Sequence, residues 1–432
     1  MSPSSRRDFL STTGAAVAAT TLATKTSRAD VNGKIRAAVL GVNGRGRTHI
    51  DQLEKLDGVD LAVICDPDQN VLASRAKKIE DRFGHKVDTE TDLRKVLDRD
   101  DVDVVTVATP NHWHSLATIW ACQAEKDVYV EKPGSHNIFE GRQMVAAAKK
   151  HKRIVQHGVQ LRSSVALQEA VEHLRNGTIG DVYMARGLVF RWRPSIGKKQ
   201  PKDQPKHLNW DLWQGPATSR PYSPRYVHYN WHWHWDYGNG DVGNQGVHET
   251  DMCMWGLDVE FPSQITSMGG KFLWDDDKET PEVLTSCYHY PDQKKMIQFE
   301  VRHWCTNDEK EARVGNIFYG SKGILVVKGY GSYATYLGKE NAPGPSRSEG
   351  GELENHFANF IQAVRERNPE IQNGPVESAH LRSGLAHLGN IAYRLERQLE
   401  FDPKKEEFVN DAEANQMLTR EYRAPYVVPT IA

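Results

Sequence analysis

The first third of the chain alternates short apolar runs, rich in β-branched residues, with longer segments whose apolar residues recur at helical spacing. The apolar runs predict buried strands at residues 35–41, 59–65, 102–108, 128–131 and 154–158. The longer segments predict helices at residues 70–83, 113–124 and 139–151. Because strands that alternate with helices form a parallel sheet covered on both faces, residues 30–158 predict a Rossmann-type α/β domain.

The remainder of the chain has a different pattern. A predicted helix at 166–176 is followed by an extended, strand-rich region from residue 182 to about 327. The other predicted segments are a Pro- and Lys-rich loop at 193–207, a Gly- and Pro-rich loop at 338–351, and helices at 353–367 and 377–396. Residues 159–432 therefore predict an α+β domain with a large, mostly antiparallel sheet.

The composition is that of a globular protein. Of 432 residues, 38% are hydrophobic and 26% are charged, and the formal net charge is -2. No segment combines clustered Lys and Arg with aromatic residues, so we expect no nucleic-acid partner. The five cysteines are scattered without a C-x-x-C pair, which favours neither a disulfide framework nor a cysteine zinc site, and we expect no bound metal.

The N-terminal segment, residues 1–29, has the pattern of an export signal. Paired arginines, Arg6 and Arg7, precede Phe-Leu and a mildly apolar stretch at 14–22, and a small-residue cleavage site follows at 27–29. This order resembles a twin-arginine signal, which implies the twin-arginine translocase as a partner and a periplasmic or secreted location. The stretch is too short and polar for stable membrane insertion, which needs about 20 apolar residues. The alternative is a disordered basic tail.

A glycine-rich turn follows the first predicted strand. Residues 41–46 read G-V-N-G-R-G and open a helix, which is the context of a dinucleotide-binding fingerprint. Asn43 stands where the second glycine usually lies, and Gly44 supplies that freedom one residue later. Asp66, after the second predicted strand, is near the position of the acid that binds the adenosine ribose, and its charge favours NAD over NADP. The alternative is a capping Asp in an ordinary strand-to-helix turn.

Three further motifs occur in order along the chain. Residues 109–114 read T-P-N-H-W-H, residues 131–133 read E-K-P, and residues 238–251 read G-N-G-D-V-G-N-Q-G-V-H-E-T-D. Together with the glycine-rich turn, they resemble the Gfo/Idh/MocA oxidoreductase family over nearly the whole chain after the signal. The resemblance implies a nicotinamide cofactor and a carbohydrate or polyol substrate. It also implies that residues 159–432 bind the substrate and form a homo-oligomer, with terminal helices that pack back. Asp66 favours NAD over NADP as the cofactor, and an exported enzyme must hold it tightly.

The resemblance and the motifs together give a set of predicted site residues. The predicted cofactor-binding residues are Gly41, Asn43, Gly44, Arg45, Gly46, Asp66, Pro110, Asn111, His114 and Glu131. The predicted catalytic residues are Lys132, His248 and Asn244. The predicted substrate-binding residues are Gln160, Arg162, Trp235, Asp236, Tyr237 and Asp251.

The chemistry of the predicted catalytic residues fits oxidation of an alcohol. A base must remove the hydroxyl proton while hydride leaves for the nicotinamide ring, and Lys132 ends a strand where open α/β sheets bind ligands. His248 is expected to titrate near neutrality and to take or relay the proton. Asn244 stands where the family commonly has an Asp, and because an amide accepts no proton, the base must be His248 or Lys132.

The segment Trp231-His-Trp-His-Trp-Asp-Tyr237 allows more than one interpretation. If it is extended, its tryptophans lie on one face and form a wall for a sugar ring, with the histidines on the other face. The alternatives are an aromatic core with hydrogen-bonded histidines, or a metal site that combines His232 and His234 with His248, Glu249 or Asp251.

Three functions remain open from the sequence. The first is an NAD(P)-dependent oxidoreductase that acts on CH-OH groups of sugars. The second is a redox-neutral glycosidase or lyase, in which transient oxidation acidifies the neighbouring C–H and the hydride later returns; it suits an exported protein without a supply of free NAD. The third is a non-catalytic sugar- or nucleotide-binding protein on a Rossmann scaffold.

Overall fold

The computed structural model describes residues 33–198, 202–304, 307–351 and 354–431. The predicted export signal at 1–29 lies outside these residues. Within them, no helix is both long enough and apolar enough to cross a membrane.

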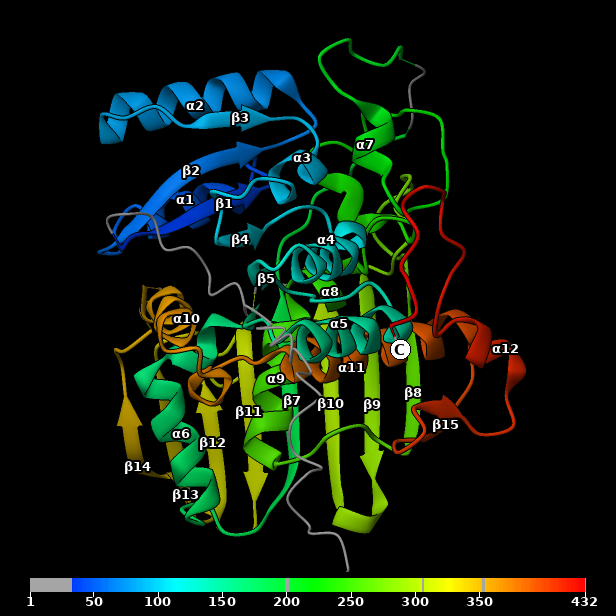
Figure 1. The fold of residues 1–432 in the computed structure, drawn as a ribbon. Helices are drawn as coiled ribbons and strands as arrows, with labels where there is room; N and C mark the ends of the chain where they lie inside the picture. Colours follow the sequence, from blue (N-terminus) through cyan, green and yellow to red (C-terminus); the bar gives the residue numbers. More distant parts are fainter. Residues whose placement is uncertain (1–32, 199–201, 305–306, 352–353, 432) are drawn as a thin grey trace, which may run out of the picture.

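The first domain is built on a six-stranded parallel sheet with the order β3-β2-β1-β4-β5-β6 (Figure 1). The strands are β1 (Ile35–Leu40), β2 (Val59–Cys65), β3 (Asp88–Glu90), β4 (Val104–Val107), β5 (Asp127–Glu131) and β6 (Val155–Gly158). All but β3 coincide with predicted apolar runs. The sequence of β3, Asp-Thr-Glu, has no apolar residue and therefore no periodic signal.

Helices cover both faces of this sheet because successive strand residues point to opposite sides. The helices are α1 (Gly46–Leu53), α2 (Gln69–Phe83), α3 (Leu93–Leu97), α4 (Asn111–Gln123) and α5 (Ile138–His151). Ala37 and Val39 of β1 join the core formed with α1 and α2. Ala38 and Leu40 join the core formed with α3, α4 and α5.

The second domain is built on a ten-stranded sheet with the order β14-β13-β12-β11-β7-β10-β9-β8-β15-β16. The strands are β7 (Val182–Phe190), β8 (Gln264–Gly270), β9 (Val283–Tyr290), β10 (Lys295–Arg302), β11 (Val314–Gly320), β12 (Gly323–Val327), β13 (Tyr333–Leu337), β14 (Ala342–Arg347), β15 (Leu399–Asp402) and β16 (Glu407–Phe408). Among the described strand pairs of this sheet, only β7 and β10 are parallel. The predicted fold class, a Rossmann domain followed by a domain with a mostly antiparallel sheet, is confirmed.

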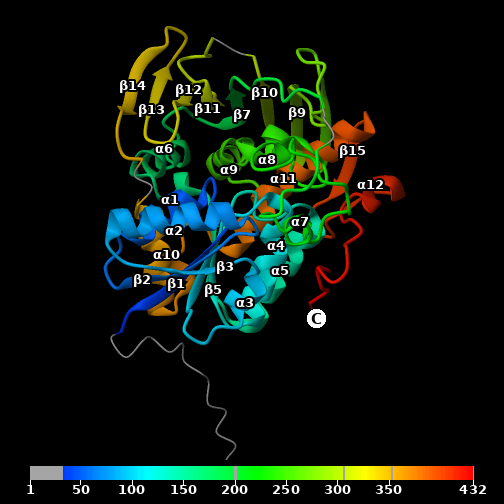
Figure 2. The ribbon, with the colours of Figure 1, turned by 90° about the horizontal axis from the view of Figure 1, so that it is seen from above.

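A layer of helices separates the two sheets. The helices after the first domain are α6 (Val165–Arg175), α7 (Trp210–Gln214), α8 (Gly240–Asn244), α9 (Gly246–Leu257), α10 (Glu354–Glu366), α11 (Val376–Leu395) and α12 (Ala412–Gln416), with 3-10 turns η1 (Gln160–Ser163), η2 (Asn230–Trp233), η3 (Pro291–Gln293) and η4 (Pro369–Ile371). Helices α6, α9 and α11 pack on one face of the ten-stranded sheet, and Figure 2 shows them between it and the first domain.

The C-terminal segments return to the first domain. Helix α10 contributes Phe357 and Phe360 to the core on the α1 face of the six-stranded sheet. Tyr426 and Val428, near the end of the chain, are buried in the core on the opposite face. Both faces of the Rossmann sheet are therefore completed by residues distant in sequence.

Two expectations for the second domain are wrong. The region predicted as mostly extended contains α7, α8 and α9; nearly every residue of α9 is buried, so the segment lacks the amphipathic period that predicts a helix. The Gly- and Pro-rich segment predicted as a loop at 338–351 contains strand β14. Two prolines fit there because β14 is an edge strand, where missing N–H donors are tolerated.

Residues 202–237, which we call the aromatic segment, connect β7 to α8 and form a small core of their own. The members of this core are Leu208, Trp210, Trp213, Ala217, Tyr226, Trp231 and Tyr237. Trp210 and Trp213 of α7 are stacked with ring centroids 4.8 Å apart. Trp113 of α4 donates its indole N–H to the Leu212 carbonyl, at 3.0 Å. The segment is thereby fixed against the first domain.

Candidate active site

A cavity of about 650 Å³, which we call the reaction cavity, lies at the carboxyl ends of β1, β2, β4 and β5. It spans the point between β1 and β4 where the strand order reverses, which is where open α/β sheets bind ligands. The opposite wall comes from the aromatic segment, from α8 and α9, and from Tyr330. The cavity therefore contains residues from both domains.

The glycine-rich turn approaches its neighbours too closely for side chains. A Cβ atom on Gly41, whose φ is +83°, would lie 2.8 Å from the Ala108 carbonyl oxygen. A Cβ on Gly46 would lie 1.9 Å from the Gly41 oxygen. A Cβ on Gly44 would meet no described atom within 4 Å, and Gly44 lines the cavity. The turn is thus packed against its neighbours at Gly41 and Gly46 and open to the cavity at Gly44. The open part lies at the N-terminus of α1, where phosphate oxygens bind favourably.

Asp66, which directly follows β2, also lines the cavity. One carboxylate oxygen accepts a hydrogen bond from the Val42 amide at 3.0 Å, and the other accepts one from the Asp68 amide at 3.1 Å. Burial raises the pKa of Asp66 to about 6, and the hydrogen bonds from the two amides oppose this rise. The carboxylate is ionised at neutral pH and lies on the cavity wall.

Glu131 joins the glycine-rich turn to the end of β5. The carboxylate accepts hydrogen bonds from Arg45 at 2.8 Å and from Gln160 at 3.0 Å, and it contacts the His49 ring at 3.1 Å. Burial alone would raise the pKa of Glu131, but the charge of Arg45 and the hydrogen bond from His49 lower it well below its usual range. Glu131 is therefore an ionised anchor that orients Arg45 beside the cavity.

Lys132 follows Glu131 and extends towards the second domain. Its ammonium group donates a hydrogen bond to the main-chain carbonyl of Asn244, at the end of α8. Burial lowers the pKa of Lys132 to about 8, although the charge of Glu131 opposes the shift. A lysine with this pKa is partly neutral near physiological pH and can accept a proton there.

His248, on α9, lines the same cavity as Lys132. Burial, followed by the charge of Lys132, lowers the pKa of His248 to about 3. The expectation that His248 titrates near neutrality is therefore wrong, because the sequence does not reveal how deeply the ring is buried. As a neutral imidazole, His248 still offers one nitrogen as donor and one as acceptor.

Asn244 forms hydrogen bonds through both its main chain and its side chain. The carbonyl accepts from Lys132, while the amide group donates to Asp241 at 3.0 Å. Asp241 is also held by two hydrogen bonds from Arg193, at 2.8 and 2.7 Å. Burial alone would raise the pKa of Asp241, but the contact with His303 and the charge of Arg193 lower it far below its usual range. The buried Asp241 thus fixes the turn that positions Lys132.

A group of polar residues near His248 is not among the predicted site residues. Gln245 donates hydrogen bonds to Tyr330 and, at 3.2 Å, to Glu249. Burial raises the pKa of Glu249 to about 8, so this carboxyl is mostly protonated at neutral pH. Gln245 lies inside the glycine-rich motif at 238–251, which is the one signal that pointed to it. Nothing in the sequence around Tyr330 indicates that it reaches the cavity.

The structure brings most of the predicted site residues to one cavity. The predicted cofactor and catalytic residues on its wall are Gly41, Asn43, Gly44, Arg45, Asp66, Pro110, Asn111, His114, Glu131, Lys132, Asn244 and His248. Gly46 lies behind the turn, packed on the Gly41 carbonyl. Of the predicted substrate residues, Gln160 lines the cavity.

The other predicted substrate residues lie elsewhere. Asp251 of α9 and Arg162 of η1 form a largely buried ion pair, with hydrogen bonds of 2.6 to 3.1 Å. Trp235 and Asp236 line a separate cavity beside α11, and Tyr237 is buried in the core of the aromatic segment. Their types match a sugar site, but the chain turns away from the reaction cavity before it reaches them.

The segment from Trp231 to Tyr237 is not extended. It begins with the 3-10 turn η2, and this turn places His232 and Trp231 together on the cavity wall, stacked with centroids 3.6 Å apart. His234 instead contacts Glu279, and Asp251 is paired with Arg162. The residues of the alternative metal site are thus dispersed, and the described residues contain no group of three or more His, Cys, Asp or Glu side chains arranged to hold a metal.

The aromatic segment is fastened to the first domain beside Asp66. Asp68 contacts the rings of His207, at 3.0 Å, and His228, at 3.1 Å. Two main-chain hydrogen bonds of 2.9 Å join Gln69 to the His207 carbonyl and Asn209 to the Pro67 carbonyl. We call these four contacts the clasp. Asp68 also caps α2, so the clasp joins the aromatic segment to the turn that carries Asp66.

These residues fit a nicotinamide dinucleotide. Gly44 leaves room for the diphosphate at the start of α1, and Asp66 offers an ionised carboxylate to the ribose hydroxyls. Lys132, which follows β5, and His248, on α9, line the same cavity. The cavity volume is within the range of about 300–1,000 Å³ typical of small-molecule sites.

Comparison with protein families gives two adjacent matches. Residues 35–159 match the NAD-binding Rossmann fold of the Gfo/Idh/MocA oxidoreductase family. Residues 181–428 match the C-terminal alpha/beta domain of the same family.

Comparison with individual proteins gives sequence matches over about a quarter of the chain and fold matches over 85% of it. The chain is 35% identical over 120 residues to a glycosyl hydrolase family 109 protein of Shewanella sp. (strain ANA-3), and 34% identical over 120 residues to an alpha-N-acetylgalactosaminidase of Shewanella oneidensis; each match covers 27% of this chain and 26% of the relative. The WlbA dehydrogenase from Bordetella pertussis, solved with NADH and UDP-GlcNAcA, has a TM-score of 0.64 at 18% identity, covering 85% of this chain and 99% of that one. The aldose-aldose oxidoreductase from Caulobacter crescentus has a TM-score of 0.65 at 17% identity, covering 85% and 100%. At these identities the structures support the fold alone.

Proposed function

Because the chain belongs to the Gfo/Idh/MocA oxidoreductase family, we propose that it transfers a hydride between a hydroxyl-bearing carbon of a carbohydrate or polyol and a tightly held NAD. The observation that carries the proposal is the position of Lys132. Its amine reaches from β5 to the Asn244 carbonyl, in the cavity that also contains His248 and the glycine-rich turn.

The roles of the residues follow from their protonation states. NAD, when bound, supplies the acceptor for the hydride. The neutral fraction of Lys132 accepts the hydroxyl proton, and the Asn244 carbonyl orients the amine that receives it. His248 stays neutral and orients the substrate hydroxyl by a hydrogen bond. Glu131 keeps Arg45 beside the cavity, where the guanidinium balances negative charge of the cofactor.

Asp66 supports NAD as the preferred cofactor. Its carboxylate lies at the end of β2, on the cavity wall, and is ionised at neutral pH. An ionised carboxylate accepts hydrogen bonds from both ribose hydroxyls and repels a 2′-phosphate. The proposal is therefore NAD rather than NADP.

A second candidate is a redox-neutral glycosidase, and the clasp favours it. We infer that the clasp slows release of a bound cofactor, because the aromatic segment lines the cavity and its separation from Asp68 would break two histidine contacts and two main-chain hydrogen bonds. A retained cofactor suits a cycle in which the hydride returns to the substrate after bond cleavage. The names of the partial relatives, a family 109 glycosyl hydrolase and an alpha-N-acetylgalactosaminidase, point in the same direction.

The proposal extends to location and assembly. Export by the twin-arginine translocase would deliver the folded protein with its cofactor to the periplasm. The face of the ten-stranded sheet opposite the helices is where we propose a symmetric contact with a second copy of the chain, because Met268 of β8 is 81% exposed there.

A single-turnover experiment tests the proposed function. Protein purified with its bound nucleotide is mixed with a panel of sugars, polyols and glycosides, and the absorbance of reduced nicotinamide is followed. Lys132→Met should slow reduction by at least ~100-fold, the usual scale for loss of a positioned base. Lys126→Met is the matched control, because Lys126 precedes β5 at the end remote from the cavity and its pKa is also lowered by burial. Equal rates in both variants would remove Lys132 from the mechanism.

The same traces separate the two candidates. A dehydrogenase leaves the nicotinamide reduced after one turnover, whereas a redox-neutral enzyme shows transient reduction that decays without an added oxidant.

A further inference from the structure

A second cavity of about 630 Å³ adjoins the reaction cavity. The two share Gln245 and Tyr330 in their walls, and Tyr330 is also near His248, with ring centroids 5.2 Å apart. The second cavity lies where β7 ends and β11 begins. Its main lining residues are Phe190, Arg191, Trp192, Gln245, Arg313 and Tyr330.

The charged side chains that line the second cavity are positive. Arg191 and Arg313 line it, and its described lining residues include no Asp or Glu. Arg191 donates a hydrogen bond to the side-chain oxygen of Gln245 at 2.6 Å, which places its guanidinium directly beside the reaction cavity. No carboxylate in the described part of the chain lies within 4 Å of Arg191 to neutralise it. A ligand with a negative group would supply that charge.

Exposed aromatic rings continue from the second cavity. Trp192 is 52% exposed and Trp304 is 46% exposed, and their ring centroids are 3.9 Å apart. Trp274 packs against Trp304, with centroids 5.2 Å apart, and donates its indole N–H to the Arg193 carbonyl at 3.2 Å. Large indole faces left in solvent offer a stacking surface for the C–H faces of sugar rings.

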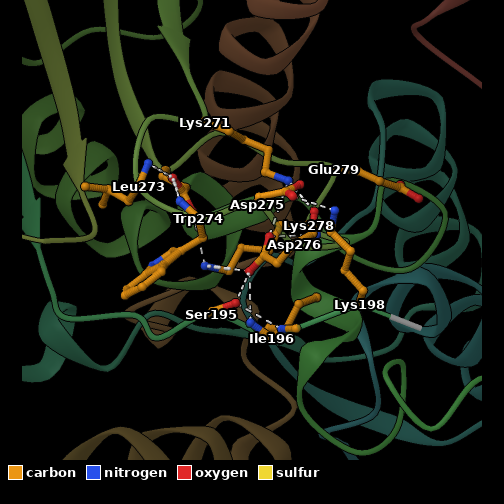
Figure 3. A network of polar contacts seen from close by, with 12 residues as sticks. Ser195, Ile196, Lys198, Lys271, Leu273, Trp274, Asp275, Asp276, Lys278 and Glu279 are labelled. Atoms are coloured by element: carbon orange, nitrogen blue, oxygen red, sulfur yellow. Dashed lines mark hydrogen bonds and ion pairs between the residues drawn. The ribbon is translucent and has the colours of Figure 1, made fainter. Parts of the chain in front are cut away.

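A buried polar network holds this aromatic surface in place (Figure 3). Lys278 is fully buried between Asp276, at 3.5 Å, and Glu282, at 3.4 Å. Glu282 accepts hydrogen bonds from the amides of Leu273 and Trp274, and Asp276 accepts one from the Ile196 amide. The loop that carries Trp274 is therefore fixed on both sides, so the rings present a preformed surface at low entropic cost.

We propose that the second cavity is a subsite for an acidic sugar unit, with Arg191 and Arg313 binding the anionic group and Trp192 stacking on the ring. The substrate class is thus a glycoside or oligosaccharide with a uronate carboxylate or a sulfate ester, whose neighbouring unit reacts beside Lys132. This inference rests on the proposed function for the identity of the reaction, but its test is a measurement of binding. Gln245, shared by the two cavities, contacts both Arg191 and the polar group near His248.

Binding of matched sugars to the purified protein with its bound nucleotide tests the subsite. The probes are glucuronate, glucose 6-sulfate and glucose, and dissociation constants are obtained by saturation-transfer NMR at low and high salt. The variants are Arg191→Gln and Arg313→Gln, alone and combined. Arg175→Gln is the control, because Arg175 is exposed on α6 and lines neither cavity. Trp192→Ala tests the stacking surface separately.

At least one acidic probe should bind about tenfold more tightly than glucose at low salt. The double arginine variant should remove this preference, and Arg175→Gln should retain it. Preference for glucuronate alone assigns a carboxylate, and preference for glucose 6-sulfate alone assigns a sulfate ester. Trp192→Ala should weaken every sugar that binds there, without changing the preference for acids.

Equal affinity for glucose and both acidic probes, or a preference that survives the double arginine variant, would overturn the subsite. A failure of the proposed function has a different signature, because acidic sugars would still bind through the arginines while the nicotinamide was never reduced.

Discussion

The pH dependence of the hydride-transfer step follows from the environment of Lys132. Burial lowers its pKa from the ordinary value of 10.5 to about 8. At pH 7 about 10% of such an amine is neutral, against about 0.03% for an unshifted lysine, so burial increases the amount of usable base by about 300-fold. Because the neutral amine is the active form for oxidation, the rate should rise with pH and level off above about pH 8.

The assay is single-turnover reduction of the bound nicotinamide between pH 6 and 9, with a saturating substrate. Below the midpoint the rate should change about tenfold per pH unit. An oxidised nicotinamide ring is cationic and lowers the pKa of Lys132 further, so the midpoint should fall at or below 8. In Lys132→Met the residual rate should lose this rise. A wild-type rate that is constant across the range, or a variant that keeps the same profile, would refute the assignment of Lys132 as the base.

Four further changes have defined outcomes. His248→Ala should keep the bound nucleotide, measured by mass spectrometry, but slow nicotinamide reduction by at least ~100-fold, and unchanged turnover would exclude a catalytic role. Asp66→Ser should weaken NAD and improve relative NADP affinity in calorimetry, and wild-type protein should lose NAD affinity as the pH falls below about 6, because the carboxylate becomes protonated; tighter wild-type binding of NADP would contradict this. His207→Ala should accelerate exchange of bound NAD for labelled NAD, since it removes one contact of the clasp, and an unchanged exchange rate would argue against retention by the clasp. Arg6→Lys combined with Arg7→Lys should leave folded protein in the cytoplasm by fractionation, and an unchanged periplasmic yield would show that the export signal is misread.

The sequence was most informative where local pattern and chemistry coincide. Gly41 and Gly46 are recognisable because the tight turn excludes side chains, and Lys132 because it directly follows an apolar strand. These features depend on neighbours within a few residues. Every strand of the first domain except β3 is predicted for the same reason, since strands buried on both faces are continuously apolar, whereas the Asp-Thr-Glu sequence of β3 is not.

The sequence was least informative where long-range packing decides. Tyr330, between β12 and β13, reaches the cavity because the second sheet packs against α9, and no periodicity signals this. His248 was expected to titrate near neutrality, but a pKa depends on burial, which composition does not give. Trp235 and Tyr237 have the residue types of a sugar site, but the 3-10 turn η2 redirects the chain and places them in other surroundings.

Isotope transfer tests the central claim most directly. Protein purified with its bound nucleotide is incubated with sugars deuterated at their carbinol carbons, and the nucleotide is released by rapid denaturation and weighed by mass spectrometry. The account predicts reduced nicotinamide one mass unit heavier with deuterated than with ordinary substrate, and little transfer in Lys132→Met. Deuterium appears in the reduced nicotinamide if the reaction is a net oxidation. It also appears there at early times if the reaction is redox-neutral. Protein that carries the nucleotide but takes up no deuterium from any sugar of the panel would contradict hydride transfer as its function.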